Sequence, residues 1–283
     1  MTIGNILKLI ERYFPAGTAM DKDRIGLQVQ SGNEEVRKIL ITLELDDHVI
    51  EEATKKNCDC IISFHPLIFF PITELHDNER VGRLVQKLIK SNISLISIHT
   101  NFDSYINGTS YILANKLNLK KSGFLVPDTN YEGYGMGVLA TPERTLTPEE
   151  ILERVQSVCR SPIRYNMSGT SEINKIAIVG GSGTSFISNA LANGADCLIT
   201  ADVTYHRFHE VNGKMMLIDP GHYEMEQFVP LGLLRFFIDH IDSCEYDLIC
   251  NSQTHTNPIK YYPSGNYQEE QKKYLINNSM VVE

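Results

Sequence analysis

The sequence has few of the features that place a protein in a membrane or outside the cell. Nowhere do about 18 apolar residues run together, the minimum length for a helix that crosses a membrane. The N-terminal stretch MTIGNILKLIERYF places apolar side chains at helical spacing, with Lys8 and Glu11 among them. It therefore lacks the continuous apolar segment of a signal peptide. We expect a soluble, cytoplasmic protein.

Paired cysteines and excess positive charge are also missing. None of the six cysteines forms a CxxC pair, which favours buried thiols in a reducing compartment over a disulfide or zinc framework. The formal net charge is -9, which argues against a broad surface for nucleic acid. The pairs Lys120-Lys121 and Lys272-Lys273 are too short to change this, and solvated surface is the simpler role for them.

Two common catalytic motifs are absent as well. No G-x-S-x-G sequence occurs, which argues against a serine hydrolase. The segment GGSGTS (180–185) follows a strand-like run, as a phosphate-binding loop would. However, it lacks the lysine of a P-loop and the third glycine of a dinucleotide-binding fingerprint. We favour the alternative for this segment, a tight turn between a strand and a helix.

The sequence does contain strand-like runs that alternate with helical ones. KILITL, CDCIIS and ISLISIH are separated by helical patterns from about Asp46 and around 80–90. The alternation returns as KIAIVGG, DCLIT and MMLID, with helical patterns from about Thr184 and over 203–211. Such alternation predicts an α/β fold with a largely covered sheet. At 283 residues and 42% hydrophobic composition, the chain can form one or two globular domains.

The second series of segments resembles the first. Residues 38–63 align with residues 175–200 without a gap, at a constant offset of 137, and eight of the 26 positions are identical. Chance reinforced by shared patterning is one explanation, but the matched order of elements favours an internal duplication. We predict two similar α/β halves, 1–127 and 128–260, and a polar C-terminal tail, 261–283. Thr147, Pro148 and Glu150 predict a helix that starts with a capping box.

Histidines and acids follow three of the strand-like runs, in the segments FHP, HTNFD and GHYEME. His99 and Asp103 are four residues apart, as are His222 and Glu226. If each histidine lies at a strand end and each acid in the turn or helix that follows, the side chains can converge where ligands bind to α/β sheets. Imidazoles and carboxylates suit zinc, iron, manganese or cobalt, whereas calcium needs more oxygen ligands. From the residues alone, scattered structural histidines are an equally good explanation.

These segments, in this order, resemble the NIF-three-like family, whose members are also labelled GTP cyclohydrolase I type 2 homologs. The resemblance spans nearly the whole chain, from DRIGLQV (23–29) through HPLIF, HTNFD, GGSG, TADV and GHYEME to THTNPI (254–259). It implies a protomer of two similar α/β domains, a metal site in the cleft between them, and a ring-shaped hexamer. Some members carry an extra domain between the halves, and the stretch 130–172 is too short for it. The chain resembles the compact form.

The resemblance also implies a set of metal ligands. His65, Asp103, His222 and Glu226 match ligands of the family, and Glu226 matches a glutamate that bridges two ions. His99 matches a histidine close to the centre, either as a ligand or as a neighbour of one.

The chain departs from the family pattern at two of its segments. The family typically has two adjacent histidines before the proline, where this chain has Phe64 and His65. We therefore expect one tightly held ion per protomer and a second that is weak or absent. The segment TAD (200–202) departs from T-G-D or T-G-E, although Asp202 keeps the acid.

The leading functional hypothesis is a metal-dependent hydrolase that acts on a nucleotide or a similar small anionic substrate, as the family label implies. The ion would lower the pKa of a bound water, and Asp202, His206 or His99 would move protons. For Asp202 and His206, a helix-opening acid and a solvated histidine are equally good explanations. Ring opening of GTP rests on the family label alone. The alternatives are a non-catalytic metal-binding ring that serves as a scaffold and, less favoured at this net charge, a ring that threads nucleic acid.

Overall fold

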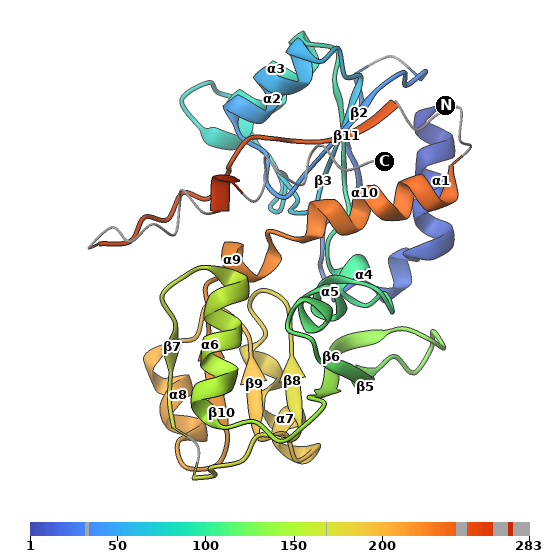
Figure 1. The fold of residues 1–283 in the computed structure, drawn as a ribbon. Helices are drawn as coiled ribbons and strands as arrows, with labels where there is room; N and C mark the ends of the chain where they lie inside the picture. Colours follow the sequence, from blue (N-terminus) through green and yellow to red (C-terminus); the bar gives the residue numbers. More distant parts are fainter. Residues whose placement is uncertain (32–33, 168, 242–247, 263–270, 274–283) are drawn as a thin grey trace. The chain divides into compact units, whose positions relative to one another are not determined.

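The chain divides into two compact units (Figure 1). The computed structural model describes residues 1–31, 34–167, 169–241, 248–262 and 271–273. The first unit combines residues 1–102 with residues 229–283, and the second comprises residues 103–228. This division differs from the predicted boundary at residue 127, and the pairing of the strands explains the difference.

The first unit contains a five-stranded sheet with the order β1-β4-β3-β2-β11. Its strands are β1 (Gly26–Val29), β2 (Ile39–Thr42), β3 (Cys60–Ser63), β4 (Ser94–Ser97) and β11 (Ile249–Asn251). The pairs β11–β2, β2–β3 and β3–β4 are parallel, and β1 is antiparallel to β4. Because β11 pairs with β2, the C-terminal part of the chain completes a sheet that the N-terminal part begins.

Helices cover both faces of this sheet (Figure 1). The helical elements are α1 (Ile3–Tyr13), the 3-10 turn η1 (Ala16–Thr18), α2 (Asp47–Lys55), α3 (Arg80–Lys90), α4 (Thr100–Asp103) and α10 (Val229–His240). Asp46 caps α2 by accepting a hydrogen bond from the backbone N–H of Val49 at 2.8 Å, as expected for a helix that starts there. Apolar side chains of α2 and α3 share one core with Leu40, Ile61 and Leu95 of the strands. Phe14, the residue after α1, packs against Phe236 of α10 with ring centroids 4.4 Å apart.

The second unit contains a six-stranded sheet with the order β5-β6-β8-β9-β10-β7. Its strands are β5 (Lys120–Pro127), β6 (Gly135–Thr141), β7 (Arg164–Tyr165), β8 (Ile176–Ile178), β9 (Cys197–Ile199) and β10 (Met216–Asp219). Strands β8, β9 and β10 are parallel, whereas β5–β6, β6–β8 and β10–β7 are antiparallel. A boundary at residue 127 would separate β5 from β6, which form one hairpin.

The second unit contains the helical elements α5 to α9 and the 3-10 turn η2. They are α5 (Thr109–Lys116), α6 (Pro148–Cys159), the 3-10 turn η2 (Thr184–Phe186), α7 (Ile187–Ala192), α8 (Tyr205–Val211) and α9 (His222–Glu226). The predicted capping box of α6 is confirmed. The Thr147 hydroxyl accepts from the backbone N–H of Glu150 at 3.2 Å, and the Glu150 carboxylate accepts from the backbone N–H of Thr147 at 2.9 Å.

One hydrogen-bond arrangement occurs in each unit at the offset found in the sequence. In the first unit, the carboxylate of Asp59 accepts from the backbone N–H of Lys38 at 3.3 Å. In the second, Asp196 accepts from the backbone N–H of Lys175 at 2.8 Å. Each acid precedes its strand and holds the start of the neighbouring parallel strand. The duplication itself stays a prediction.

Three further expectations concern membranes, cysteines and the tail. Among the described residues, no helix is long and apolar enough to cross a membrane. The cysteines in the described part of the chain are free thiols, namely Cys58, Cys60, Cys159, Cys197 and Cys250. Most of the predicted tail, 261–283, lies outside the described residues.

Candidate metal centre

Two of the predicted site residues lie side by side in the first unit. His65 follows β3 and His99 follows β4, and these strands are parallel neighbours. The two imidazole rings are nearly perpendicular, with centroids 5.6 Å apart. The ends of two parallel strands thus bring these two histidines together.

A carboxylate holds the ring of His65. Its Nδ1 lies 3.0 Å from Oε2 of Glu44, which follows β2. The other oxygen of Glu44 accepts from the guanidinium of Arg80 at 2.8 Å. Because an ionised carboxylate can only accept, Nδ1 carries a proton and donates to Glu44. This is the arrangement that most metal-binding histidines have.

His99 has a similar partner. Its Nδ1 lies 2.8 Å from Oδ1 of Asp23, and the other oxygen of Asp23 accepts from both the backbone N–H and the hydroxyl of Thr100. Burial raises the pKa of Asp23, but the hydrogen bonds from His99 and Thr100 outweigh this effect and lower the pKa to about 2. Burial likewise raises the pKa of Glu44, and its bonds to His65 and Arg80 bring the net value below the usual range. Both acids therefore stay ionised at neutral pH.

Phe64 closes the inner side of this histidine pair. Its side chain is fully buried, and its ring centroid lies 5.1 Å from that of His65 and 5.4 Å from that of His99. A third ring, that of Phe102, lies 6.5 Å away. The position that holds a histidine in the family pattern is thus occupied here by an apolar ring without a ligand atom.

The second unit places two of the predicted residues, Asp202 and Glu226, around His222. This histidine begins α9, and Glu226 ends it one turn later, so that Nε2 of His222 lies 3.0 Å from Oε2 of Glu226. Nδ1 of His222 lies 2.7 Å from Oδ2 of Asp202, which follows β9. The same oxygen of Asp202 accepts a hydrogen bond from the hydroxyl of Ser182. Asp202 has φ 54°, a left-handed conformation that aspartate tolerates better than most residues.

The surroundings of His222 are strongly negative. Burial lowers its pKa, but the charge of Glu226 and the hydrogen bonds with Asp202 and Glu226 outweigh burial and raise the pKa to about 11. The pKa of Asp202 is below its usual range, chiefly because of its bond to His222. Two carboxylates around one imidazole favour a cation at this place.

The GGSG turn lies against these side chains. Gly181 has φ +59°, and a Cβ atom there would lie 2.5 Å from Oε1 of Glu226 and 3.2 Å from Nε2 of His222. A Cβ atom at Gly180 would lie 3.9 Å from Oδ1 of Asp103. The two glycines therefore let bare backbone approach the predicted ligands. The nearby carboxylates would repel a phosphate, which supports the tight-turn interpretation of this segment.

The residues present fit a divalent metal ion. In the second unit, Asp103, His222 and Glu226 supply carboxylate oxygens and an imidazole nitrogen, the ligands that zinc, iron, manganese and cobalt accept. The glycine turn lets the backbone lie close to these groups. In the first unit, His65 and His99 supply two further imidazoles, and an ionised acid holds Nδ1 of each.

The remaining predicted residue, His206, is exposed on α8, and its ring lies 5.5 Å from that of Tyr205. Sequence reasoning missed Glu44 and Asp23 as partners of the histidines. A signal was present for both, because Glu44 follows a strand in ITLELDD and Asp23 begins the DRIGLQV motif. Neither position indicates by itself which histidine it would meet.

Similarity to known proteins agrees with these features. The family model of Duf34/NIF3 (NGG1p interacting factor 3) matches residues 1–258, which is nearly the whole chain. The chain belongs to the Duf34/NIF3 family. Its similarity extends to a Lactococcus lactis protein named a GTP cyclohydrolase 1 type 2 homolog. The two are 32% identical over 267 residues, covering 92% of this chain and 99% of the relative.

Solved structures confirm the α/β fold of this Duf34/NIF3 chain. A Staphylococcus aureus protein superposes with a TM-score of 0.84 at 27% identity, covering 92% of this chain and 99% of that one. A Bacillus cereus protein described as related to NIF3 gives the same TM-score and coverage at 23% identity. The resemblance drawn from the ordered motifs is thereby confirmed at the level of family and fold.

Proposed function

We propose that this protein binds a divalent metal ion and uses it to hydrolyse a nucleotide or a similar small anionic molecule. The proposed ligands are His65, Asp103, His222 and Glu226, with His99 as a ligand or close neighbour. His65, His222 and Glu226 each offer one ligand atom of a type that holds zinc, iron, manganese or cobalt. Hydrolysis of GTP in particular rests on the name that relatives carry, and that name states homology only.

The observation that carries the proposal is the carboxylate at Nδ1 of each of the three histidines. Glu44 holds His65, Asp23 holds His99 and Asp202 holds His222, at 3.0, 2.8 and 2.7 Å. A structural histidine needs no such repeated arrangement. A metal ligand does benefit from it, because the carboxylate fixes the ring orientation and makes the other ring nitrogen a stronger metal ligand.

The residues around the ion would divide the remaining tasks. When bound, a divalent ion supplies a Lewis acid that makes water a stronger nucleophile at neutral pH. Asp202, predicted as catalytic, is already hydrogen-bonded to His222 and Ser182, which supports a role in orienting His222. His99, held by Asp23, can give or take a proton at Nε2. The catalytic role of His206 stays a prediction that rests on its place in the TADVTYH segment.

We further propose one tightly held ion per protomer and a second that is weak or absent. The apolar ring of Phe64 occupies the place of a family histidine and offers no ligand atom. We also keep the proposals that the two units arose by duplication, that the metal site lies between them, and that six protomers form a ring. The recurrence of the Asp59 and Asp196 arrangements at the same offset supports the duplication.

One observation favours the alternative of a metal-binding interaction protein. The segment between β3 and α3 exposes four large apolar side chains, of which Phe70 is 78% exposed. They are Phe69, Phe70, Ile72 and Leu75. Such a patch is typical of a surface that binds protein, either another copy of this chain or a different partner.

The experiment that tests the proposed function combines metal analysis with a substrate screen. Untagged protein is analysed for its metals, stripped, reloaded with each candidate ion and screened against nucleotides and phosphoesters. We expect turnover that depends on the metal, and we expect Glu226→Gln to lose both tight metal binding and turnover. Glu210→Gln, the same change on an exposed helix, serves as the matched control. Metal bound without turnover of any compound would favour the scaffold instead.

A further inference from the structure

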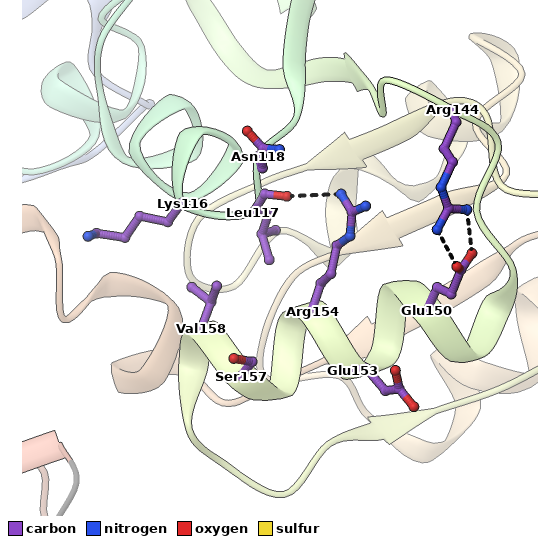
Figure 2. A pocket seen from close by; sticks show the side chains of 9 residues that line it. All are labelled: Lys116, Leu117, Asn118, Arg144, Glu150, Glu153, Arg154, Ser157 and Val158. Carbon is purple, nitrogen blue, oxygen red and sulfur yellow. Dashed lines mark hydrogen bonds and ion pairs between the residues drawn. The ribbon is translucent and has the colours of Figure 1, made fainter.

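The second unit has a cavity of about 490 Å³ whose lining contains none of the proposed metal ligands (Figure 2). Its walls are the end of α5, residue Arg144 and one side of α6. The lining residues are Lys116, Leu117, Asn118, Arg144, Glu150, Glu153, Arg154, Ser157 and Val158. This volume lies within the usual range for sites that bind small molecules.

The charges of the lining do not cancel. Arg144 and Glu150 neutralise each other, because the two guanidinium nitrogens of Arg144 each bond one carboxylate oxygen of Glu150, at 3.1 and 2.5 Å (Figure 2). Of the other charged lining residues, Lys116 and Arg154 are cations and Glu153 is the single carboxylate. A net positive cavity is notable in a chain whose formal net charge is -9.

The two remaining cations are held at the end of α5. Arg154 donates from one guanidinium nitrogen to the carbonyl oxygen of Leu117 at 3.4 Å, and Figure 2 shows its side chain directed from α6 toward that carbonyl. The ammonium group of Lys116 lies 4.7 Å from the ring centroid of Phe228. The carbonyl end of a helix attracts cations, so capping α5 is one sufficient role for Arg154.

Capping α5 uses few of the hydrogen-bond donors in the lining of the cavity. A guanidinium has five N–H groups, and within the described part of the chain one weak bond to Leu117 is the hydrogen bond seen for Arg154. The amide of Asn118 and the hydroxyl of Ser157 add neutral donors to the same lining. These are the groups that bind an oxyanion, and Glu153 can accept a hydrogen bond from a ligand hydroxyl.

We propose that this cavity binds the phosphate group of a small hydroxylated phosphate ester. Arg154 binds two phosphate oxygens, Lys116 adds charge, and Glu153 accepts from a hydroxyl of the ligand. The site is separate from the proposed metal centre and does not depend on the proposed hydrolysis.

The test measures binding by calorimetry at low salt, with metal-free protein so that the metal centre does not contribute. The probes are inorganic phosphate, ribose 5-phosphate and ribose. We expect ribose 5-phosphate to bind more tightly than phosphate, and ribose not to bind. Arg154→Gln should weaken ribose 5-phosphate binding about ten-fold or more, and Lys116→Gln should weaken it about three-fold or more, since charge-assisted hydrogen bonds are lost. Glu153→Gln should tighten inorganic phosphate binding, because a like charge is removed.

Arg207→Gln is the matched control, because Arg207 lies on α8, pairs with Glu210 and loses the same charge. Thermal melting of every variant separates binding from folding. Three results would overturn the proposal. They are absence of binding at millimolar ribose 5-phosphate, equal weakening by Arg207→Gln and Arg154→Gln, and a lower Tm for Arg154→Gln with unchanged phosphate affinity. The last result would mean that Arg154 only caps α5.

Discussion

Replacing Phe64 by histidine tests why this chain departs from the family pattern. The phenyl ring is fully buried between His65, His99 and Phe102, so the new imidazole would start in an apolar setting. We expect the lost ring contacts to cost about 1–2 kcal/mol of unfolding free energy. An unsatisfied buried imidazole adds about 1–3 kcal/mol. The metal-free variant should therefore be less stable by about 2–5 kcal/mol, or roughly 5–15 °C in Tm.

Metal should reverse much of this loss if the imidazole becomes a ligand. Binding to the folded state alone adds about 2.7 kcal/mol when free metal is 100 times Kd. We expect Phe64→His to hold a second ion tightly and to gain more in Tm on loading than the native protein. The measurements are elemental analysis and thermal melting, with and without each metal.

Phe64→Leu is the matched control, because it also removes the ring but adds no ligand atom. It should lose about 1–2 kcal/mol and keep the native metal content. Two outcomes would refute the reasoning. One is that the native protein already holds two equally tight ions, and the other is that the histidine variant holds no more metal than the leucine variant.

Three further predictions concern other parts of the molecule. Asp202→Asn should weaken metal binding about 10–100-fold, because His222 loses the carboxylate at Nδ1. Competition with a chromogenic chelator measures the metal affinity. An affinity equal to that of the native protein would contradict the role of Asp202 in orienting His222. Light scattering should give six times the protomer mass of 32.0 kDa, and a monomer at micromolar concentration would exclude the ring. The Glu150 carboxyl should titrate near its pKa of about 2, lowered chiefly by Arg144, so its contribution to stability is present above the unfolded glutamate pKa and disappears as pH falls toward 2. Carboxyl NMR checks this, and Arg144→Ala should raise the midpoint.

Local signals in the sequence were sufficient for most of the elements. The capping box at Thr147 and the cap at Asp46 place helix starts correctly because a cap needs only neighbours within one turn. The strand ends also place His65 beside His99, because parallel neighbours end at the same edge of a sheet. The structure also explains how alanine can stand at position 201, where the family pattern has glycine. The left-handed backbone conformation falls on Asp202, so position 201 does not require a glycine.

Other features depend on contacts between distant residues. The pairing of β11 with β2 moves the C-terminal part of the chain into the first unit, and nothing in its short apolar run identifies β2 as the partner. The bonds of Glu44 to His65 and of Asp23 to His99 join segments 21 and 76 residues apart. Motif spacing finds proposed ligands that lie on one helix turn, such as His222 and Glu226, but it cannot find the acids that hold the histidine rings.

The return of the chain to β2 has a consequence for synthesis on the ribosome. The sheet of the first unit lacks its edge strand β11 until residue 251 has been made, whereas the second unit ends at residue 228. The second unit can therefore complete its structure while the first still exposes the edge of β2. Parallel pairing over so long a loop forms slowly, and an open strand edge invites aggregation. Ribosome-bound chains that stop before β11 should thus be the stage at which this protein most needs a chaperone.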